Sequence, residues 1–335
     1  MPRAPKKPPR RGSFEDKLAR IGALADAPPQ AALPELRRFL TDASGYLTGD
    51  AAAVTTKLGL RELIPDLAAA FSRLIAGSVG PSSTDKGCFG KKRVLEALLQ
   101  LDADVPDVYL AGIRYEQREP SFPDFIDTAS PIRSLSAHAL FQIHHPGAVH
   151  EVTPLLMDAQ PDVRTEAASA LGSSGVDLAA PILHLKVLTG DREPDVLGAC
   201  FKGLLRLAPP RYLPVVSRHL VGDDAAVAEA AALALGESRL REAFPILKDR
   251  IESGVDPTLD DSILLGIALL RSDEGNDYLF SLVGSAPERR AALALTALAL
   301  HRHDPRITER ARQWVATRGS RRLGQVLAEK FGAPT

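Results

Sequence analysis

The chain has 335 residues, of which 45% are apolar, and its 41 basic and 42 acidic residues give a net charge of −1. A chain of this size can bury a continuous core, and its balanced charge gives no overall signal for nucleic acid or anionic lipid. It has no run of 18 or more apolar residues and no hydrophobic stretch after its first positive charges, which argues against a membrane span and a secretory signal. We therefore expect a cytoplasmic protein, and the two widely spaced cysteines fit that location.

Residues 1–12 are expected to form a disordered basic tail, because "MPRAPKKPPRRG" holds five basic residues and four prolines. Residues 13–47 are expected to form an N-terminal helical cap. The segment "SFEDKLARIGALAD" places its large apolar residues on one helix face, and "LPELRRFLTDASGYL" predicts a second helix.

An internal repeat follows the cap. Four segments align without gaps: "IRSLSAHALF" from Ile132, "VRTEAASALG" from Val163, "VLGACFKGLL" from Val196 and "VAEAAALALG" from Val227. Their apolar and small residues have the spacing of a helix with one buried face. A second motif recurs between these helices, with copies "IPDL" at Ile64, "TPLL" at Thr153, "APIL" at Ala180, "LPVV" at Leu213 and "FPIL" at Phe244. Its proline suits the first turn of a second helix, so the repeating unit is predicted to be a helical hairpin.

These hairpins resemble HEAT repeats, and in their shortness they are similar to the HEAT-like repeats of the phycobilin lyase group. The resemblance covers residues 48–318 and implies an all-α fold, a right-handed α-solenoid of about seven to eight repeats. Residues 319–335 would form a C-terminal cap, so that residues 13–335 make a single domain. Because both ends are capped, we expect a monomer. HEAT arrays serve as enzymes, scaffolds and nucleic-acid binders, so the resemblance says little about function.

The leucine of the "AL" pair measures the length of each repeat. Leu140, Leu171, Leu204, Leu235 and Leu269 follow one another at intervals of 31, 33, 31 and 34 residues. Towards the N-terminus the intervals lengthen, since Leu98 lies 42 residues before Leu140 and Leu58 lies 40 residues before Leu98. The additional residues fall in two loops, 77–87 and 115–130, each between the second helix of one repeat and the first helix of the next. Equivalent insertions in a solenoid emerge on the same edge, so the two loops are predicted to lie side by side.

We predict that a partner binds to residues of the two loops and of the helix that follows the first loop. These residues are Tyr115, Glu116, Arg118, Phe122, Asp124, Phe125, Asp127, Asp85, Lys86, Lys91 and Lys92. Aromatic anchors with a polar rim are common at binding hot spots, and long insertions in compact folds often carry function. An alternative stays open, in which the loops pair only with each other and their phenylalanines plug a groove of the solenoid. Ser130 would then cap the helix that Pro131 begins.

No motif for catalysis, a cofactor or a metal emerges from the sequence. Four histidines lie between positions 138 and 150, but they match no established ligand spacing, and histidines at helix ends are the alternative to a metal site. Cys88 lies in "DKGCFGKK", where a helix N-terminus and two lysines would lower a thiol pKa, although a small packed residue is the other interpretation. Cys200 occupies the core stripe and is expected to be inert. The sequence thus favours a protein without enzymatic activity and without a cofactor.

Basic residues near the two ends motivate a rival hypothesis, because Glu288 to Lys330 holds ten basic residues and four acidic ones. Such clusters can contact phosphates, as in the DNA glycosylases built from HEAT-like repeats, which cradle a duplex in a basic groove with tryptophans near the lesion. This chain has one tryptophan, Trp314, in its C-terminal helices. We therefore predict a non-catalytic scaffold or adaptor that binds another protein. The alternatives are nucleic-acid binding, and a lyase-like or chaperone-like partner of a chromophore protein.

Overall fold

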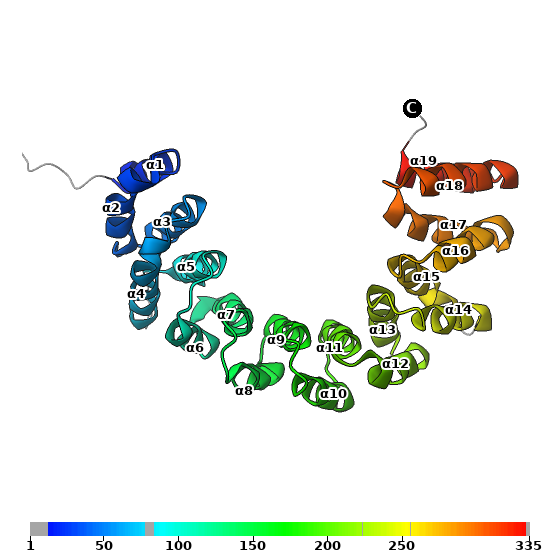
Figure 1. The fold of residues 1–335 in the computed structure, drawn as a ribbon, viewed down its shortest axis with the longest axis horizontal. Coiled ribbons are helices and arrows are strands. Elements are labelled where there is room, and N and C mark those ends of the chain that lie inside the picture. Colours follow the sequence, from blue (N-terminus) through cyan, green and yellow to red (C-terminus); the bar gives the residue numbers. More distant parts are fainter. Residues whose placement is uncertain (1–12, 78–83, 223, 255, 333–335) are drawn as a thin grey trace, which may run out of the picture. The chain divides into compact units, whose positions relative to one another are not determined.

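The computed structural model describes residues 13–77, 84–222, 224–254 and 256–332. These residues contain 19 α-helices and a single two-stranded sheet, which confirms the predicted all-α solenoid of helical hairpins (Figure 1). The predicted basic tail, residues 1–12, lies outside the described residues, as do positions 78–83 of the first loop. Over the described ranges, every helix is too short or too polar to cross a membrane.

Contacts group the chain into two compact units, Met1–Val163 and Arg164–Thr335. The helices of the first unit are α1 (Phe14–Leu24), α2 (Pro29–Leu40), α3 (Gly45–Lys57), α4 (Ile64–Ala76), α5 (Phe89–Gln100), α6 (Pro106–Ile113), α7 (Ser130–Gln142) and α8 (Ala148–Val152). The first helices of its hairpins, α1, α3, α5 and α7, pack in one row, and the second helices α2, α4, α6 and α8 pack in another. The apolar faces between the two rows form the core of this unit.

The second unit repeats this arrangement. Its helices are α9 (Pro161–Ser173, which begins just before the unit), α10 (Ala179–Thr189), α11 (Pro194–Leu207), α12 (Pro209–Arg218), α13 (Ala225–Glu237), α14 (Ala243–Ser253), α15 (Asp260–Leu269), α16 (Asp273–Ser285), α17 (Glu288–Leu298), α18 (Pro305–Arg318) and α19 (Arg321–Phe331). Helices α11, α13, α15, α17 and α19 pack in one continuous row. From α3/α4 to α17/α18, the described residues form eight consecutive hairpins, within the predicted number.

Prolines mark many of the helix starts. The prediction for the second helices holds for Pro65, Pro181 and Pro245, which lie in the first turns of α4, α10 and α14, and fails for two others. Pro161 and Pro194 are the first residues of α9 and α11, and Pro65 is the second residue of α4. At these positions the missing N–H breaks no helical hydrogen bond.

The prediction was wrong for Pro214, which lies inside α12, because that helix already begins at Pro209. It was also wrong for Pro154, which lies in a 3-10 turn after the end of α8.

Glycines allow consecutive first helices to approach each other at backbone distance. A Cβ atom on Gly236 of α13 would lie 2.3 Å from the carbonyl oxygen of Gly266 on α15, and one on Gly172 of α9 would lie 2.4 Å from the Cα of Gly203 on α11. The small residues of the repeat stripe therefore set the spacing between neighbouring hairpins.

Candidate functional site

The second loop is a β-hairpin, whereas the sequence analysis predicted a long loop in an all-α fold. Strand β1 (Arg118–Ser121) pairs antiparallel with β2 (Asp124–Asp127), in a register that places Arg118 opposite Asp127 and Pro120 opposite Phe125. Phe122 and Pro123 form the turn, and the peptide bond between them is cis. The described residues contain no other strands. In secondary structure, this hairpin therefore differs from the helical repeats on either side of it.

The tip of the hairpin is apolar and open to solvent. Phe122 is fully exposed, and Phe125 and Ile126 expose 57% and 52% of their surface. The Arg118 guanidinium lies over the Phe125 ring, 5.8 Å from its centroid. Because these side chains reach outward, the alternative in which the phenylalanines plug a groove is wrong. The hairpin presents them instead.

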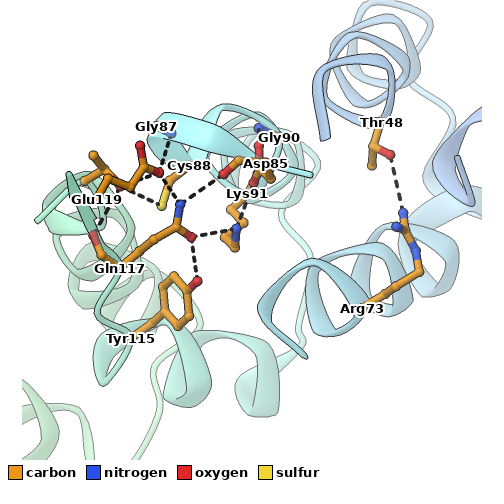
Figure 2. Close-up of polar contacts among 11 residues, drawn as sticks. Thr48, Arg73, Asp85, Gly87, Cys88, Gly90, Lys91, Tyr115, Gln117 and Glu119 are labelled. Atoms are coloured by element: carbon orange, nitrogen blue, oxygen red, sulfur yellow. Dashed lines mark hydrogen bonds and ion pairs between the residues drawn. The ribbon is translucent and has the colours of Figure 1, made fainter. Parts of the chain in front are cut away.

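Gln117 joins the base of the hairpin to the first loop (Figure 2). Its side-chain oxygen accepts hydrogen bonds from Lys91 Nζ at 3.0 Å and from the Tyr115 hydroxyl at 2.6 Å. Its amide nitrogen donates to the Asp85 carbonyl oxygen at 3.0 Å and to Glu119 Oε1 at 2.5 Å. The sequence analysis missed Gln117. The signal that could have found it is the spacing of Tyr115, Gln117 and Glu119, because every second residue of an extended chain lies on the same side.

The predicted contact between the two loops is confirmed by direct bonds. The Gly87 N–H donates to Glu119 Oε1 at 2.7 Å, and the Cys88 sulfur lies 3.6 Å from the Thr128 hydroxyl oxygen. The position of the hairpin is thus fixed by the segment that precedes α5 as well as by its own two ends.

Asp85 and Lys91 lie inside this junction. Lys91 Nζ is 3.0 Å from Asp85 Oδ2, and the two side chains are 0% and 1% exposed. The carboxylate of Asp85 also accepts from the N–H groups of Gly90 and Lys91 at the start of α5 (Figure 2). A buried pair of this kind fixes the α5 start against the hairpin and presents no charge at the surface. Of the predicted partner-binding residues in this part of the chain, Lys86 and Lys92 remain exposed.

A second ion-pair cluster holds the end of the hairpin against α7. Arg133, whose side chain is 5% exposed, lies 2.7 Å from Asp127 Oδ2 and donates to both carboxylate oxygens of Asp158 at 2.8 and 3.0 Å. Arg133 also donates to the Tyr115 carbonyl oxygen at 2.9 Å. Asp127 accepts from the Ala129 N–H, whereas the N-terminus of α7 receives no side-chain cap, so the predicted capping by Ser130 is wrong.

The two acidic residues at the hairpin base are held in their ionised form. Burial by itself raises the pKa of Glu119, but hydrogen bonds from Gln117, Gly87 and Thr128 outweigh that effect and hold the pKa below its usual value. Burial likewise opposes ionisation of Asp127, and the Arg133 guanidinium together with backbone N–H groups lowers its pKa overall. The charged residues Glu116, Arg118 and Asp124 are exposed. Asp124 directly follows the turn, and Arg118 reaches the Phe125 ring, whereas Glu116 precedes β1 at the base.

Neither cysteine has the environment of a reactive thiol. Burial raises the pKa of Cys88 to about 11 and that of Cys200 to about 12, so the interpretation of Cys88 as an activated thiol is wrong. Among the histidines of segment 138–150, the ring of His145 accepts a hydrogen bond from the Gly147 N–H at a helix end. In the described parts of the chain, no three His, Cys, Asp or Glu side chains come together as metal ligands.

Several arginines of the C-terminal helices serve internal contacts. Arg318 donates to the carbonyl oxygens of Val283 and Ala286, and Arg290 pairs with the buried carboxylate of Asp260 at 3.0 Å. Trp314 packs on α16, where a Cβ atom on Gly284 would lie 2.2 Å from its ring. The single tryptophan is therefore part of the packing between α16 and α18.

Comparison with known proteins agrees with this architecture. Residues 183–268 match the family model for HEAT repeats. No curated protein matches the sequence. Among solved structures, the chain is similar to the complex of CpcE and CpcF of phycocyanin lyase from a Nostoc species, with 18% identity, a TM-score of 0.40 and coverage of 74% of this chain and 93% of that one.

Two further structures show a similar level of likeness. The YibA protein of Escherichia coli is 16% identical, with a TM-score of 0.45 and coverage of 87% of this chain and 97% of that one. Kap121p bound to Pho4p is 14% identical, with a TM-score of 0.45, and the match covers 92% of this chain and 42% of Kap121p. The family match lies on α10 to α15, which are therefore HEAT repeats, and the same helical hairpin runs through both units, so this protein is an α-solenoid.

Proposed function

We propose that this protein is a non-catalytic scaffold or adaptor that binds another protein through the tip of the β1–β2 hairpin. The observation that carries the proposal is the full exposure of Phe122 on a hairpin whose base is tied into the protein by buried hydrogen bonds. The two buried cysteines are compatible with the cytoplasmic location that we propose for it.

The tip has the composition of an interaction hot spot. Aromatic side chains that enter a pocket of the partner contribute most of the binding energy at many interfaces, and surrounding polar residues exclude water from them. Phe122 and Phe125 supply the anchors, and Arg118 and Asp124 supply the charged rim. Solvated phenylalanine is unfavourable by about 1.5–3 kcal/mol relative to full burial, so a partner that covers both rings gains a substantial free energy.

The fixed base of the hairpin adds to that gain. Binding costs about 0.5–1.5 kcal/mol for each flexible side chain that is immobilised, and ordering a mobile loop costs more. Lys91, Gln117 and Arg133 hold the hairpin in one position before a partner arrives. The anchors are therefore presented on a pre-organised support, which favours affinity.

Substitution of the tip tests this proposal. Phe122→Ser, Asp124→Asn and Phe125→Ser are combined in one variant, and the control combines Val221→Ser and Leu300→Ser, which change residues that are 73% and 41% exposed elsewhere. Both variants are expected to keep the helical circular-dichroism signal. We expect the tip variant to bind the partner recovered with the wild type at least 10-fold more weakly, about 1.4 kcal/mol, and the control to bind normally. Equal capture by the tip variant would rule out the hairpin as the contact.

A salt titration with duplex DNA tests the rival hypothesis. Phosphate contacts make affinity fall steeply with salt concentration. Micromolar or tighter binding that weakens steeply with salt, together with no recovered protein partner, would contradict the scaffold function. Absence of such binding would favour the hairpin-mediated contact with protein.

A further inference from the structure

Helix α10 is apolar on two opposite sides. One side packs into the core through Ala179, Leu183 and Val187. The other side is open to solvent, where Leu185 and Leu188 expose 62% and 71% of their surface. This outer stripe begins at Leu178, which is 50% exposed, and continues through Pro181 and Ile182. A helix that is apolar all round is normally covered on all sides.

The outer sides of the neighbouring helices in the same unit differ from this pattern. On α12 the exposed residues include Arg211 and Arg218, on α14 Asp249 and Glu252, and on α16 Asp273, Glu274 and Asp277. Between Leu178 and Leu188, by contrast, the one charged residue is Lys186, which is buried and pairs with Asp191 at 2.8 Å. The leucine stripe is thus specific to α10.

We propose that a second copy of this chain covers the outer stripe of α10, in an antiparallel helix pair. The apolar positions 178, 181, 185 and 188 have the same spacing read from either end, at intervals of 3, 4 and 3 residues. Antiparallel pairing about a twofold axis therefore places Leu178 opposite the second copy's Leu188, and Pro181 opposite the second copy's Leu185. Self-complementary patches of this kind suit a twofold interface, in which residue i meets residue j and j meets i.

Charge at the two ends of the stripe favours the same orientation. Asp177 precedes the stripe and Arg192 follows it, and both are exposed. An antiparallel pair brings Asp177 of each copy towards Arg192 of the other, whereas a parallel pair brings Asp177 of one copy towards Asp177 of the other. Glu193, next to Arg192, is also exposed, so the preference comes mainly from the Asp177 end. Opposite charges at the rim of an apolar contact select orientation and register.

The size of the stripe sets the strength of the contact. A stable interface buries about 800 Å² on each partner, and interfaces well below that size belong to weak, transient complexes. Three part-exposed leucines with a proline and an isoleucine supply only a fraction of this area. We therefore expect a reversible dimer with a dissociation constant on the order of 0.1 mM. Helical caps close the ends of the repeat rows and leave this lateral contact free to form.

Sedimentation over a concentration series measures the dimer directly. The wild type is expected to pass from monomer at about 5 µM to mainly dimer near 1 mM, as a dissociation constant of about 0.1 mM requires. Leu185→Glu is expected to weaken the dimer at least 10-fold, and the control Val221→Glu, at a residue 73% exposed outside the stripe, less than twofold. A wild type that stays monomeric at 1 mM, or a Leu185→Glu variant that associates as the wild type does, would overturn the proposal.

Cysteine cross-linking tests the register. The native cysteines are buried, so oxidation reports on introduced thiols. Leu178→Cys mixed with Leu188→Cys is expected to give a disulfide-linked dimer. Either variant alone is expected to give little, because equivalent residues in the antiparallel pair lie about 15 Å apart along the axis at about 1.5 Å per residue. Equal cross-linking of Leu178→Cys alone would contradict the antiparallel pair.

Discussion

The buried contact between Lys91 and Asp85 gives a sharp prediction for stability. Lys91→Met keeps most of the aliphatic side chain but removes the ammonium group that donates to Asp85 and Gln117. Loss of one partner from a buried ion pair costs about 3–5 kcal/mol, because the other charge stays buried and uncompensated. Asp85 keeps two backbone N–H donors, from Gly90 and Lys91, so we expect a cost near 3 kcal/mol.

Thermal and urea unfolding followed by circular dichroism measure this cost. At about 2–4 °C for each kcal/mol, the midpoint temperature should fall by about 6–12 °C. The matched control is Lys92→Met, since Lys92 is 50% exposed and its pair with Glu96 spans 3.7 Å. Such a surface pair contributes about 0.3–0.5 kcal/mol. If Lys91→Met unfolds at the same midpoint as Lys92→Met, the buried pair of Lys91 and Asp85 does not stabilise the junction of the two loops.

Two further predictions concern helix spacing and pH. Gly236→Ala places a methyl group 2.3 Å from a backbone oxygen of α15 and should destabilise the protein by about 1–3 kcal/mol in urea unfolding. The control Gly324→Ala, whose Cβ would meet no atom of a neighbouring element within 4 Å, should be neutral or stabilising. Equal effects of the two substitutions would contradict the role of Gly236 in the close approach of α13 and α15. Because the folded-state pKa values of Glu119 and Asp127 are lowered, the stability that they supply is present above about pH 4 and is lost as the pH falls through the lowered values. Asp127→Asn should therefore flatten the change in urea midpoint between pH 7 and pH 3, and an unchanged slope would refute this linkage.

The helical part of the fold was predictable because its signals are local and repeated. The stripe of apolar and small residues recurs every 31 to 34 residues, and each copy reports the same buried helix face. The longer intervals around Leu98 then located both insertions, and their adjacency followed from the geometry of stacked repeats. The hydrogen bond from the Gly87 N–H to the Glu119 carboxylate follows from that adjacency, although the residue type that accepts it was not predicted.

The buried contacts between the first loop and the hairpin could not be predicted from a repeated local pattern. A buried lysine in a hydrophilic stretch looks like a surface lysine, and Lys91 and Lys92 are indistinguishable in sequence although one is 0% and the other 50% exposed. The strand pairing was missed because the turn at Phe122 and Pro123 lacks the Asn-Gly or Asp-Gly pair that marks a hairpin. The outer leucines of α10 were hidden because the sequence does not say which of two apolar faces is covered.

Site-specific photo-cross-linking at position 122 tests the central claim most directly. A photoreactive phenylalanine analogue replaces Phe122, and a control protein carries it at Val221, which is 73% exposed. We expect one discrete protein adduct from position 122 and none from position 221. Excess unlabelled wild type should suppress that adduct, and the hairpin-tip variant should not. Adducts of equal yield at both positions, or suppression by the tip variant as complete as by the wild type, would contradict the hairpin as the partner-binding surface.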